Sequence, residues 1–211
     1  MNIAMQTICT NLDVCLVPYY TNKSKEEQYL KDVKNYFIEA GANVYIHDNT
    51  LANIGLSKAR NKLIKNCKSE VVCLIDFDIE IINIDIPAIM KKLQQKAVGI
   101  VSPVTERFSR KDKNLVWQEK EYLACNCMFI RRDTFDRIGL LDESFFVAYA
   151  DWDLIKRVLN ADLKIYQHNL SNLRHFGFSR NNPNKGPIWR RDFKQFVKKW
   201  GPDGVLDRTK K

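Results

Sequence analysis

The sequence lacks any run of about 18 apolar residues, and its first residues lack the charged and apolar regions of a signal peptide. We therefore expect no membrane-spanning helix and a soluble, cytoplasmic protein. Internal repeats and low-complexity segments are also absent. With 45% hydrophobic residues, the 211 residues suffice for one well-packed core. We expect a single domain over residues 1–211.

Paired CxxC spacings are missing among the six cysteines, which argues against a structural zinc site. The cysteines lie in apolar stretches, so we expect reduced and mostly buried thiols. Cys125 and Cys127 flank a single Asn and could clip a metal ion, but two small inward-facing side chains of one strand are the simpler interpretation.

Charge is distributed unevenly along the chain. Residues 1–90 hold 9 Lys or Arg against 11 Asp or Glu, whereas residues 91–211 hold 25 against 14. From Arg174 onward the chain has 11 basic and 3 acidic residues. This concentration of positive charge is consistent with a solvated basic face or with a surface that binds an anionic partner.

Apolar periodicity predicts strands that alternate with helices. We expect strands at residues 13–18, 43–47, 71–75, 98–101, 125–130 and 164–167, and helices at residues 24–40, 57–67, 87–95, 151–160 and 189–200. A polar stretch at residues 105–114 is expected to be a mobile loop. Alternating strands and helices indicate an α/β fold with a mostly parallel sheet, whose ligands bind beyond the carboxyl ends of the strands.

Two carboxylates directly follow the most apolar of these strands. Asp76 and Asp78 are two residues apart, and in extended chain such side chains point to the same side. Mg²⁺ or Mn²⁺ takes oxygen ligands and keeps positions free for substrate phosphates, so two carboxylates suffice. Solvated acids at a strand end are an equally common reason for an Asp-x-Asp pattern, but the position after the buried strand favours a nucleotide diphosphate site.

Five ordered pieces of the chain resemble the inverting glycosyltransferases of family 2. The pieces are residues 17–20 (VPYY), 47–49 (HDN), 53–61 (NIGLSKARN), 76–78 (DFD) and 138–157 (IGLLDESFF through DWDL to Arg157). The resemblance covers nearly the whole chain and implies the GT-A fold, a three-layer α/β sandwich with a mostly parallel central sheet. It also implies a donor half at residues 1–100 and an acceptor half at residues 101–211, which ends in the basic helix.

The resemblance implies roles for several residues of the first half. Pro18 and Tyr20 match the end of the first strand, near the base of the donor, and Asp48 matches the residue that reads uracil. Arg60 and Asp76 match donor contacts. The donor is then a UDP-sugar or a similar nucleotide sugar.

The metal site implied by the resemblance consists of Asp78 and a late histidine, here His175, which would hold Mn²⁺ or Mg²⁺. A lone histidine is more often structural than a ligand. We nevertheless favour the ligand role, because neither His168 nor His47 has the corresponding position.

Displacement at an anomeric carbon needs a base that takes the proton of the acceptor hydroxyl, and Asp151 matches the family's base. Trp152 and Asp153 are the expected acceptor contacts. Helix capping is the alternative role for Asp151 and Asp153, and core packing the alternative for Trp152 and Trp117. The usual family Glu before the base is Ala150 here, which puts acceptor contacts in doubt.

The expected function is thus a metal-dependent hexosyl- or pentosyltransferase that acts on the hydroxyl of a glycan, a lipid-linked glycan or a hydroxylated nucleic-acid base. The link at residues 49–53, between the second and third matching pieces, is short, which suggests that the donor ribose is held differently from the family's usual way. The Gln-x-x-Arg-Trp motif of processive members is missing, which argues against a polymer synthase. A nucleotidyltransferase would usually carry a glycine-rich loop after the first strand, yet residues 17–25 hold no glycine. An inactive nucleotide-sugar or polyanion binding module remains the other alternative, against which the acids and His175 argue.

The expected C-terminal helix carries an apolar and a basic set of residues. The apolar set is Trp189, Phe193, Phe196, Val197 and Trp200. The basic set is Arg190, Arg191, Lys194, Lys198 and Lys199. Helical spacing predicts that the apolar set docks onto the domain, which leaves the basic set available for a polyanionic acceptor such as DNA or for an anionic membrane surface.

Overall fold

A computed structural model describes residues 11–20, 23–106, 112, 114–123, 126–177 and 185–202. Its strands are β1 (Leu12–Leu16), β2 (Asn43–Ile46), β3 (Val71–Ile75), β4 (Ile79–Asn83), β5 (Val98–Thr105), β6 (Trp117–Lys120), β7 (Cys127–Arg131) and β8 (Lys164–His175). Its helices are α1 (Lys23–Glu39), α2 (Leu56–Ile64), α3 (Ile86–Leu93), α4 (Arg132–Ile138), α5 (Ala150–Asn160) and α6 (Lys185–Trp200).

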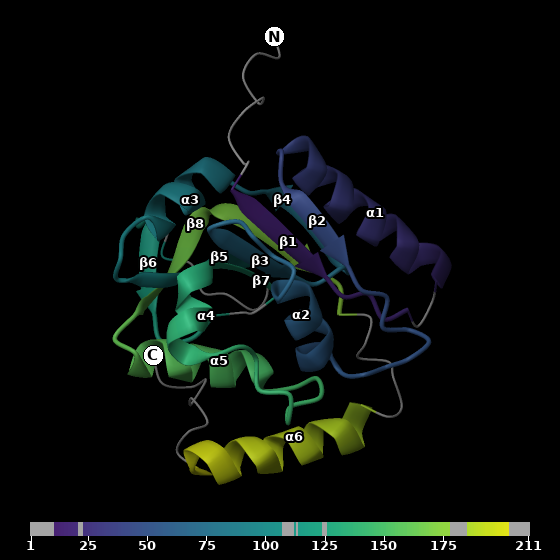
Figure 1. The fold of residues 1–211 in the computed structure, drawn as a ribbon. Helices are drawn as coiled ribbons and strands as arrows, with labels where there is room; N and C mark the ends of the chain where they lie inside the picture. The colour runs from purple at the N-terminus through teal and green to yellow at the C-terminus, as the bar shows by residue number, and fades with distance from the viewer. Residues whose placement is uncertain are drawn as a thin grey trace.

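All the strands belong to one sheet, in the order β2-β1-β3-β7-β5-β8-β4, with β6 paired to β8 (Figure 1). The strands β1, β2, β3, β5 and β8 run in one direction, and β4, β6 and β7 run against them. The α/β fold with a mostly parallel sheet is therefore confirmed. Because β2 and β3 lie on either side of β1, the chain diverges at the carboxyl end of β1, which is where ligands bind in open α/β sheets.

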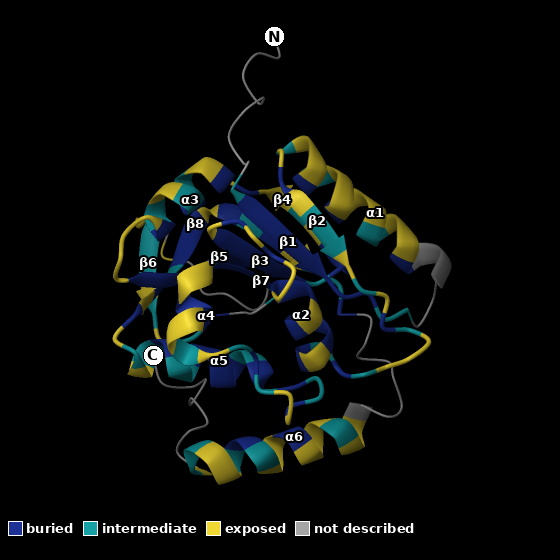
Figure 2. Ribbon diagram, in the orientation of Figure 1, coloured by how far each residue is buried: buried dark blue, intermediate teal, exposed yellow. Residues whose placement is uncertain are grey.

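Helices cover both faces of the sheet and so make a three-layer structure (Figures 1 and 2). One core contains residues of α1 and α3, and the other contains residues of α2, α4, α5 and α6. Alternate residues of the central strands enter the two cores: Cys73 of β3 packs with α1 and α3, and Leu74 packs with α2 and α5. This double coverage explains why β3 is apolar at every position.

Most of the expected helices and strands are present, and some of their ends differ. The sequence pattern missed β4, β6 and α4, and β8 continues to His175 rather than ending at Gln167. Most of the expected mobile loop at residues 105–114, and Cys125 of the expected strand at residues 125–130, lie outside the described residues.

The four described cysteines, Cys15, Cys67, Cys73 and Cys127, are free and buried, as expected. Within the described part of the chain, no helix is long and apolar enough to cross a membrane.

Candidate functional site

The carboxyl end of β3 carries a compact group of possible metal ligands. Asp76, Asp78 and His175 each offer one ligand atom, and these atoms all lie within 4.8 Å of one another. His175 Nε2 lies 3.1 Å from Asp78 Oδ1 and 3.5 Å from Asp76 Oδ2. Asp78 is 5% exposed, so the group is partly shielded from water. The sequence-predicted metal residues are thus brought together.

The antiparallel pairing of β4 with β8 places the histidine beside the two carboxylates. Ile79, the first residue of β4, is opposite His175 in the register. The backbone N–H of Phe176 also donates to the Asp78 carbonyl at 3.0 Å. The late histidine therefore reaches the end of β3 through a strand that the sequence pattern missed.

Arg60 and Asn126 fix the carboxylate of Asp76 from two sides. The Arg60 guanidinium, on α2, donates to Asp76 Oδ1 at 2.8 Å, and the Asn126 amide donates to Asp76 Oδ2 at 3.0 Å. The same Asn126 nitrogen lies 3.0 Å from His175 Nδ1. Asn126 thus connects two of the three candidate ligands.

Sequence reasoning missed Asn126, which it treated as part of a strand. The register explains its position: Cys127 of β7 is opposite Ile75, and the backbone N–H of Asp76 donates to the Asn126 carbonyl at 2.8 Å. Only the antiparallel pairing of β7 with β3 reveals this neighbour, and no local pattern encodes that pairing.

The expected donor residues of the first two strands lie at the same edge of the sheet. The Pro18 carbonyl, after β1, accepts from the Asn49 N–H at 2.9 Å. The Tyr20 N–H donates to Thr50 Oγ1 at 3.1 Å, and Asp48 Oδ1 accepts from the Thr50 N–H at 2.8 Å. The ends of β1 and β2 are thereby joined.

Tyr20 extends from this junction toward the metal ligands. Its ring packs edge-on against Phe77, which lies between the two aspartates, with 5.7 Å between centroids. Partial burial, and then the negative charge of Asp48, raise the pKa of Tyr20. The phenol is therefore neutral at physiological pH and offers an aromatic face and an O–H donor.

Hydrogen bonds also fix the short link before α2. Asn49 is 3% exposed, and its amide donates to Asn53 Oδ1 at 3.0 Å while its Oδ1 accepts from the Ile54 N–H. Gly55 follows with φ +86°, a conformation that favours glycine. The link ends in the helix that carries Arg60.

Asp151 is the second residue of α5, is partly exposed, and accepts from the Trp152 N–H at 2.9 Å through Oδ1. Its two neighbours, the expected acceptor contacts, are both buried. Trp152 is 5% exposed and packs in the core. Asp153 is 0% exposed, and its carboxylate is bonded to Arg157, Lys199 and Trp200. Burial and these partners favour the alternative roles in core packing and in holding the helix, and the acceptor contacts stay a prediction.

Core packing also accounts for two other residues. Trp117 is tilted over His168, with 4.3 Å between ring centroids. Burial lowers the pKa of His168, which is 1% exposed and lies 2.7 Å from Ser171 Oγ through Nδ1. This burial favours the neutral imidazole, and His168 belongs to the packed interior.

The candidate ligands fit a hard divalent cation. Two carboxylates and one imidazole suit Mn²⁺ or Mg²⁺, which keep further positions for water or phosphate oxygens. Asp76 and His175 share a hydrogen-bonding neighbour in Asn126, as metal ligands commonly do.

Two solved structures with a similar fold were determined with Mn²⁺. A structure of GalNAc-T7 with UDP, GalNAc and Mn²⁺ superposes with a TM-score of 0.64 at 11% identity, over 92% of this chain and 48% of that one. The mannosyltransferase PcManGT from Pyrobaculum calidifontis, with GDP-Man and Mn²⁺, gives 0.61 at 12% identity, over 91% and 65%. This chain thus spans about half the length of GalNAc-T7.

A third structure, A197 from STIV, has a TM-score of 0.55 at 15% identity, over 79% of this chain and 85% of that one. No protein of curated function matches the sequence. The sequence model described as "Glycosyl transferase family 2" matches residues 22–163, which include both aspartates at the end of β3 and Asp151. The chain therefore belongs to glycosyl transferase family 2.

Proposed function

We propose that this protein transfers a sugar from a UDP-sugar, or a similar nucleotide sugar, to an acceptor hydroxyl with inversion at the anomeric carbon. The observation that carries the proposal is the convergence of Asp76, Asp78 and His175 at the carboxyl end of β3, with Arg60 beside them. The fold is shared with glycosyltransferases whose structures contain nucleotides and Mn²⁺.

The residues of this site would divide the binding of the donor among them. Asp78, His175 and Asp76 would hold a divalent cation, which would supply positive charge to the diphosphate. The Arg60 guanidinium, paired with Asp76, adds a fixed cation at the same edge. Tyr20 and the exposed Asp48 lie at the ends of β1 and β2, where they can contact the base.

Asp151 would take the proton of the acceptor hydroxyl during an in-line attack on the anomeric carbon. Its position at the first turn of α5 supports this role, because the carboxylate is partly exposed there and an acceptor hydroxyl can reach it. Inversion requires only one such base, on the face opposite the leaving group.

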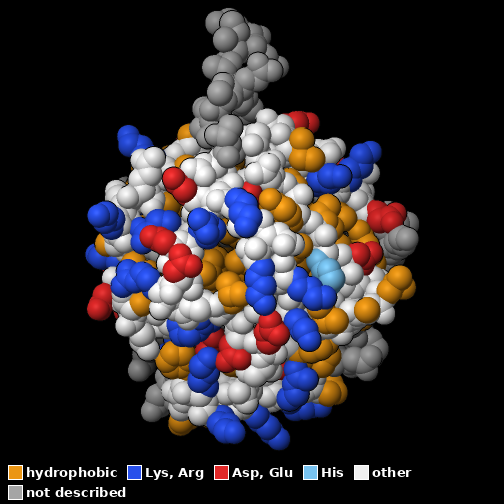
Figure 3. Space-filling view, in the orientation of Figure 1, with side chains coloured by type: hydrophobic (Ala, Val, Ile, Leu, Met, Phe, Trp, Pro, Cys, Tyr) orange, Lys and Arg blue, Asp and Glu red, His pale blue; other side chains and the backbone are white. Residues whose placement is uncertain are grey.

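We propose a polyanionic acceptor from the surface of α6. Arg190, Arg191, Lys194 and Lys198 are exposed, and the only acid of the helix, Asp192, is buried. In Figure 3, Lys and Arg side chains gather along the lower edge of the molecule, where Figure 1 places α6. DNA with a hydroxylated base would be attracted to such a face.

Two details of α6 differ from the sequence-based expectation. Lys199 is exposed but already paired with two acids: its Nζ lies 2.7 Å from Asp142 Oδ2 and 2.8 Å from Asp153 Oδ1, unlike the other residues of the basic set. Trp189 and Phe193 remain 40% exposed, whereas Phe196 is fully buried.

The proposal is tested by incubating the protein with Mn²⁺ and a panel of UDP- and GDP-sugars, with and without candidate glycan, lipid-linked and DNA acceptors. We expect acceptor-dependent release of nucleoside diphosphate and a hexose or pentose mass increment on one acceptor. Pyrophosphate release from nucleoside triphosphates would instead identify a nucleotidyltransferase. Tight donor binding without turnover on any acceptor would indicate an inactive binding module.

A further inference from the structure

The C-terminal helix α6 lies outside residues 22–163, yet a buried carboxylate on it holds the segment that leads to Asp151. Asp192 is 0% exposed. Its Oδ2 accepts from the backbone N–H groups of Phe146, Val147 and Ala148 at 3.0, 2.9 and 3.0 Å. Its Oδ1 accepts from the Arg191 guanidinium at 2.7 Å. One side chain thus fixes three consecutive peptide groups by charge-assisted hydrogen bonds.

Helix α6 also packs against Tyr149, the residue at which the chain turns into α5. Tyr149 has φ 64° and ψ −6°, a left-handed conformation that non-glycine residues rarely adopt and that persists where the surroundings impose it. Its ring contacts Trp189, Phe193 and Phe196 of α6, with centroids 6.0, 5.5 and 5.4 Å away. These contacts help to set the direction in which α5 begins.

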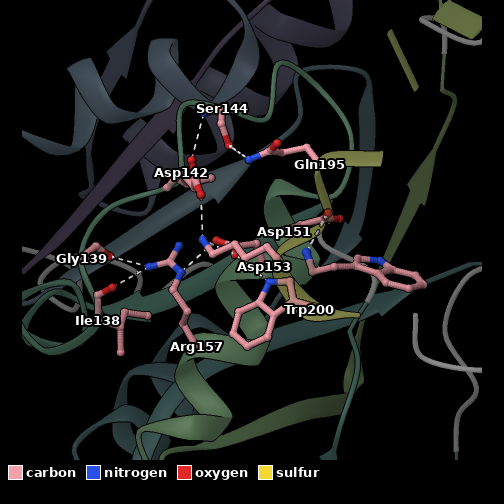
Figure 4. Close-up of polar contacts among 12 residues, drawn as sticks. Ile138, Gly139, Asp142, Ser144, Asp151, Asp153, Arg157, Gln195 and Trp200 are labelled. Atoms are coloured by element: carbon pink, nitrogen blue, oxygen red, sulfur yellow. Dashed lines mark hydrogen bonds and ion pairs between the residues drawn. The ribbon is translucent and has the colours of Figure 1, made fainter. Parts of the chain in front are cut away.

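The residues that follow Asp151 are held from the same helix. Trp200 Nε1 donates to Asp153 Oδ1 at 2.9 Å, and Lys199 Nζ lies 2.8 Å from the same oxygen (Figure 4). Arg157 of α5 binds the other oxygen at 2.9 Å. Asp151 therefore lies between two anchors, and both depend on α6.

The anchored segment also contacts the donor half. The Leu56 N–H, at the start of α2, donates to the Phe146 carbonyl at 2.6 Å. A Cβ atom on Gly55 would lie 2.8 Å from the Phe146 ring, so only glycine fits this close approach without a shift. Because α2 carries Arg60, the segment connects α6 with the arginine that binds Asp76.

We propose that Asp192 is a positioning residue for Asp151, which fixes the carboxylate of the base relative to the donor site through the backbone at residues 146–149. This inference rests on the proposed function of Asp151 as the base. Asp192 itself is buried and does not touch the reacting atoms. A shift of about 1 Å in a catalytic group can cost ~100-fold in rate, so the loss of three backbone anchors is sufficient for a large effect.

Asp13 provides a matched control for Asp192, at the end of the sheet opposite to the candidate site. Asp13 of β1 is also 0% exposed, and its Oδ2 accepts from the backbone N–H groups of Lys68 and Ser69 at 2.6 and 2.9 Å, just before β3 begins. Asp13→Ala removes the same kind of anchor without touching the site. It therefore measures what a general loss of stability does to turnover.

The experiment compares Asp192→Ala, Asp192→Asn, Asp13→Ala, Asp151→Asn and the Asp151→Asn/Asp192→Ala double variant. We expect Asp192→Ala to lower kcat ~10–100-fold while the KM for the donor and the affinity for Mn²⁺ change less than about twofold. Asp192→Asn keeps an acceptor oxygen and should restore part of kcat. The double variant should be no slower than Asp151→Asn, since a removed base cannot be misplaced. Asp13→Ala should retain kcat.

Two results would overturn the positioning role. One is a double variant whose kcat is lower than that of Asp151→Asn by the same factor that Asp192→Ala alone costs. The other is a kcat loss in Asp13→Ala as large as that in Asp192→Ala. Hydrogen–deuterium exchange distinguishes this failure from a failure of the proposed function, because it needs no turnover. Asp192→Ala should speed exchange at residues 146–148 and leave residues 71–78 unchanged. Unchanged exchange at residues 146–148 would refute the anchor even if no donor is used.

Discussion

His175 Nε2 lies 3.1 Å from Asp78 Oδ1, although 97 positions separate the two residues in the chain. The pairing of β4 with β8 holds this contact, so the ligand atoms are brought together by the protein fold itself. Cation binding to a preformed group of this kind would require little further ordering of the chain.

We expect Asp78→Ala and chelation of divalent ions to have the same effect, a weaker affinity for the donor and a lower kcat, because both remove the positive charge beside the diphosphate. His175→Ala should be milder, since two carboxylates remain. Steady-state kinetics with and without EDTA measures these effects. Glu80→Ala is the matched control, because Glu80 is an exposed carboxylate of β4 that pairs with Arg174. Full activity in excess EDTA would show that the reaction needs no divalent ion.

Asn126→Ala should lower the affinity for Mn²⁺ ~10–100-fold, because the amide fixes both Asp76 and His175. Titration of Mn²⁺ followed by electron paramagnetic resonance gives this affinity without any turnover. Asn172→Ala, on β8, removes a comparable amide whose partners are Asn83 and the Leu170 carbonyl, and it should bind Mn²⁺ as the parent does. Equal affinities of the two variants would assign Asn126 a packing role only.

Asp151→Asn should lower kcat ~10²–10⁴-fold and leave donor affinity nearly unchanged, because it removes a proton acceptor without removing volume. Single-turnover kinetics and calorimetric titration of the donor separate the two quantities. Near-normal turnover would place the base elsewhere. Asp153, the next carboxylate of α5, is the first alternative to test, although it is buried and has three partners.

The Asp142–Lys199 pair should contribute to stability above about pH 4. Burial raises the pKa of Asp142, but hydrogen bonds from Lys199 and Ser144 outweigh it and lower the pKa to about 2 from 3.8. The folded-state pKa is depressed, so the stabilisation is present above pH 3.8 and is lost as the pH falls toward 2. By linkage it amounts to about 2 kcal/mol at most.

Urea unfolding between pH 5 and pH 2 checks this, with Asp142→Asn as the test variant. The variant should lose less of its free energy of unfolding than the parent over this range. Lys199→Met should reduce the same pH dependence, because it removes the main partner that lowers the pKa. Parallel curves for the parent and Asp142→Asn would contradict the assignment.

The exposed basic residues of α6 should affect the binding of a polyanionic acceptor but not the use of the donor. Changing Arg190, Lys194 and Lys198 to Glu should raise the KM for a polyanionic acceptor and flatten its dependence on salt, while donor hydrolysis stays unchanged. Arg191 is left intact, because it pairs with Asp192. If the triple variant binds DNA, anionic vesicles and acidic glycans as the parent does, the basic face is only a solvated surface.

Local sequence patterns predicted the parts of the fold that depend on local physics. β3 was predicted at its observed bounds, because a strand buried on both faces is continuously apolar, and α1 was predicted to end before Gly41, which has φ 82°. Short edge strands such as β4 and β6 were missed, since their exposed residues give no clear alternation. The role of Asn126 depends on long-range pairing that no local pattern encodes.

Around Asp151, too, local sequence patterns could not predict contacts between residues far apart in the chain. Local spacing could not show that Asp153 is buried beneath α6, because its partners Lys199 and Trp200 lie more than 40 positions away. The inverting stereochemistry, the division into donor and acceptor halves and the cytoplasmic location stay predictions.

The most direct test of the central claim is calorimetric titration of UDP and GDP into the parent protein and into Asp78→Ala, each with Mn²⁺ and with EDTA. The account predicts that at least one nucleotide binds the parent tightly with Mn²⁺, and that EDTA and Asp78→Ala each weaken this binding, with little further loss when they are combined. Binding that is equally tight with Mn²⁺ and EDTA, or equally tight in the parent and in Asp78→Ala, would contradict it.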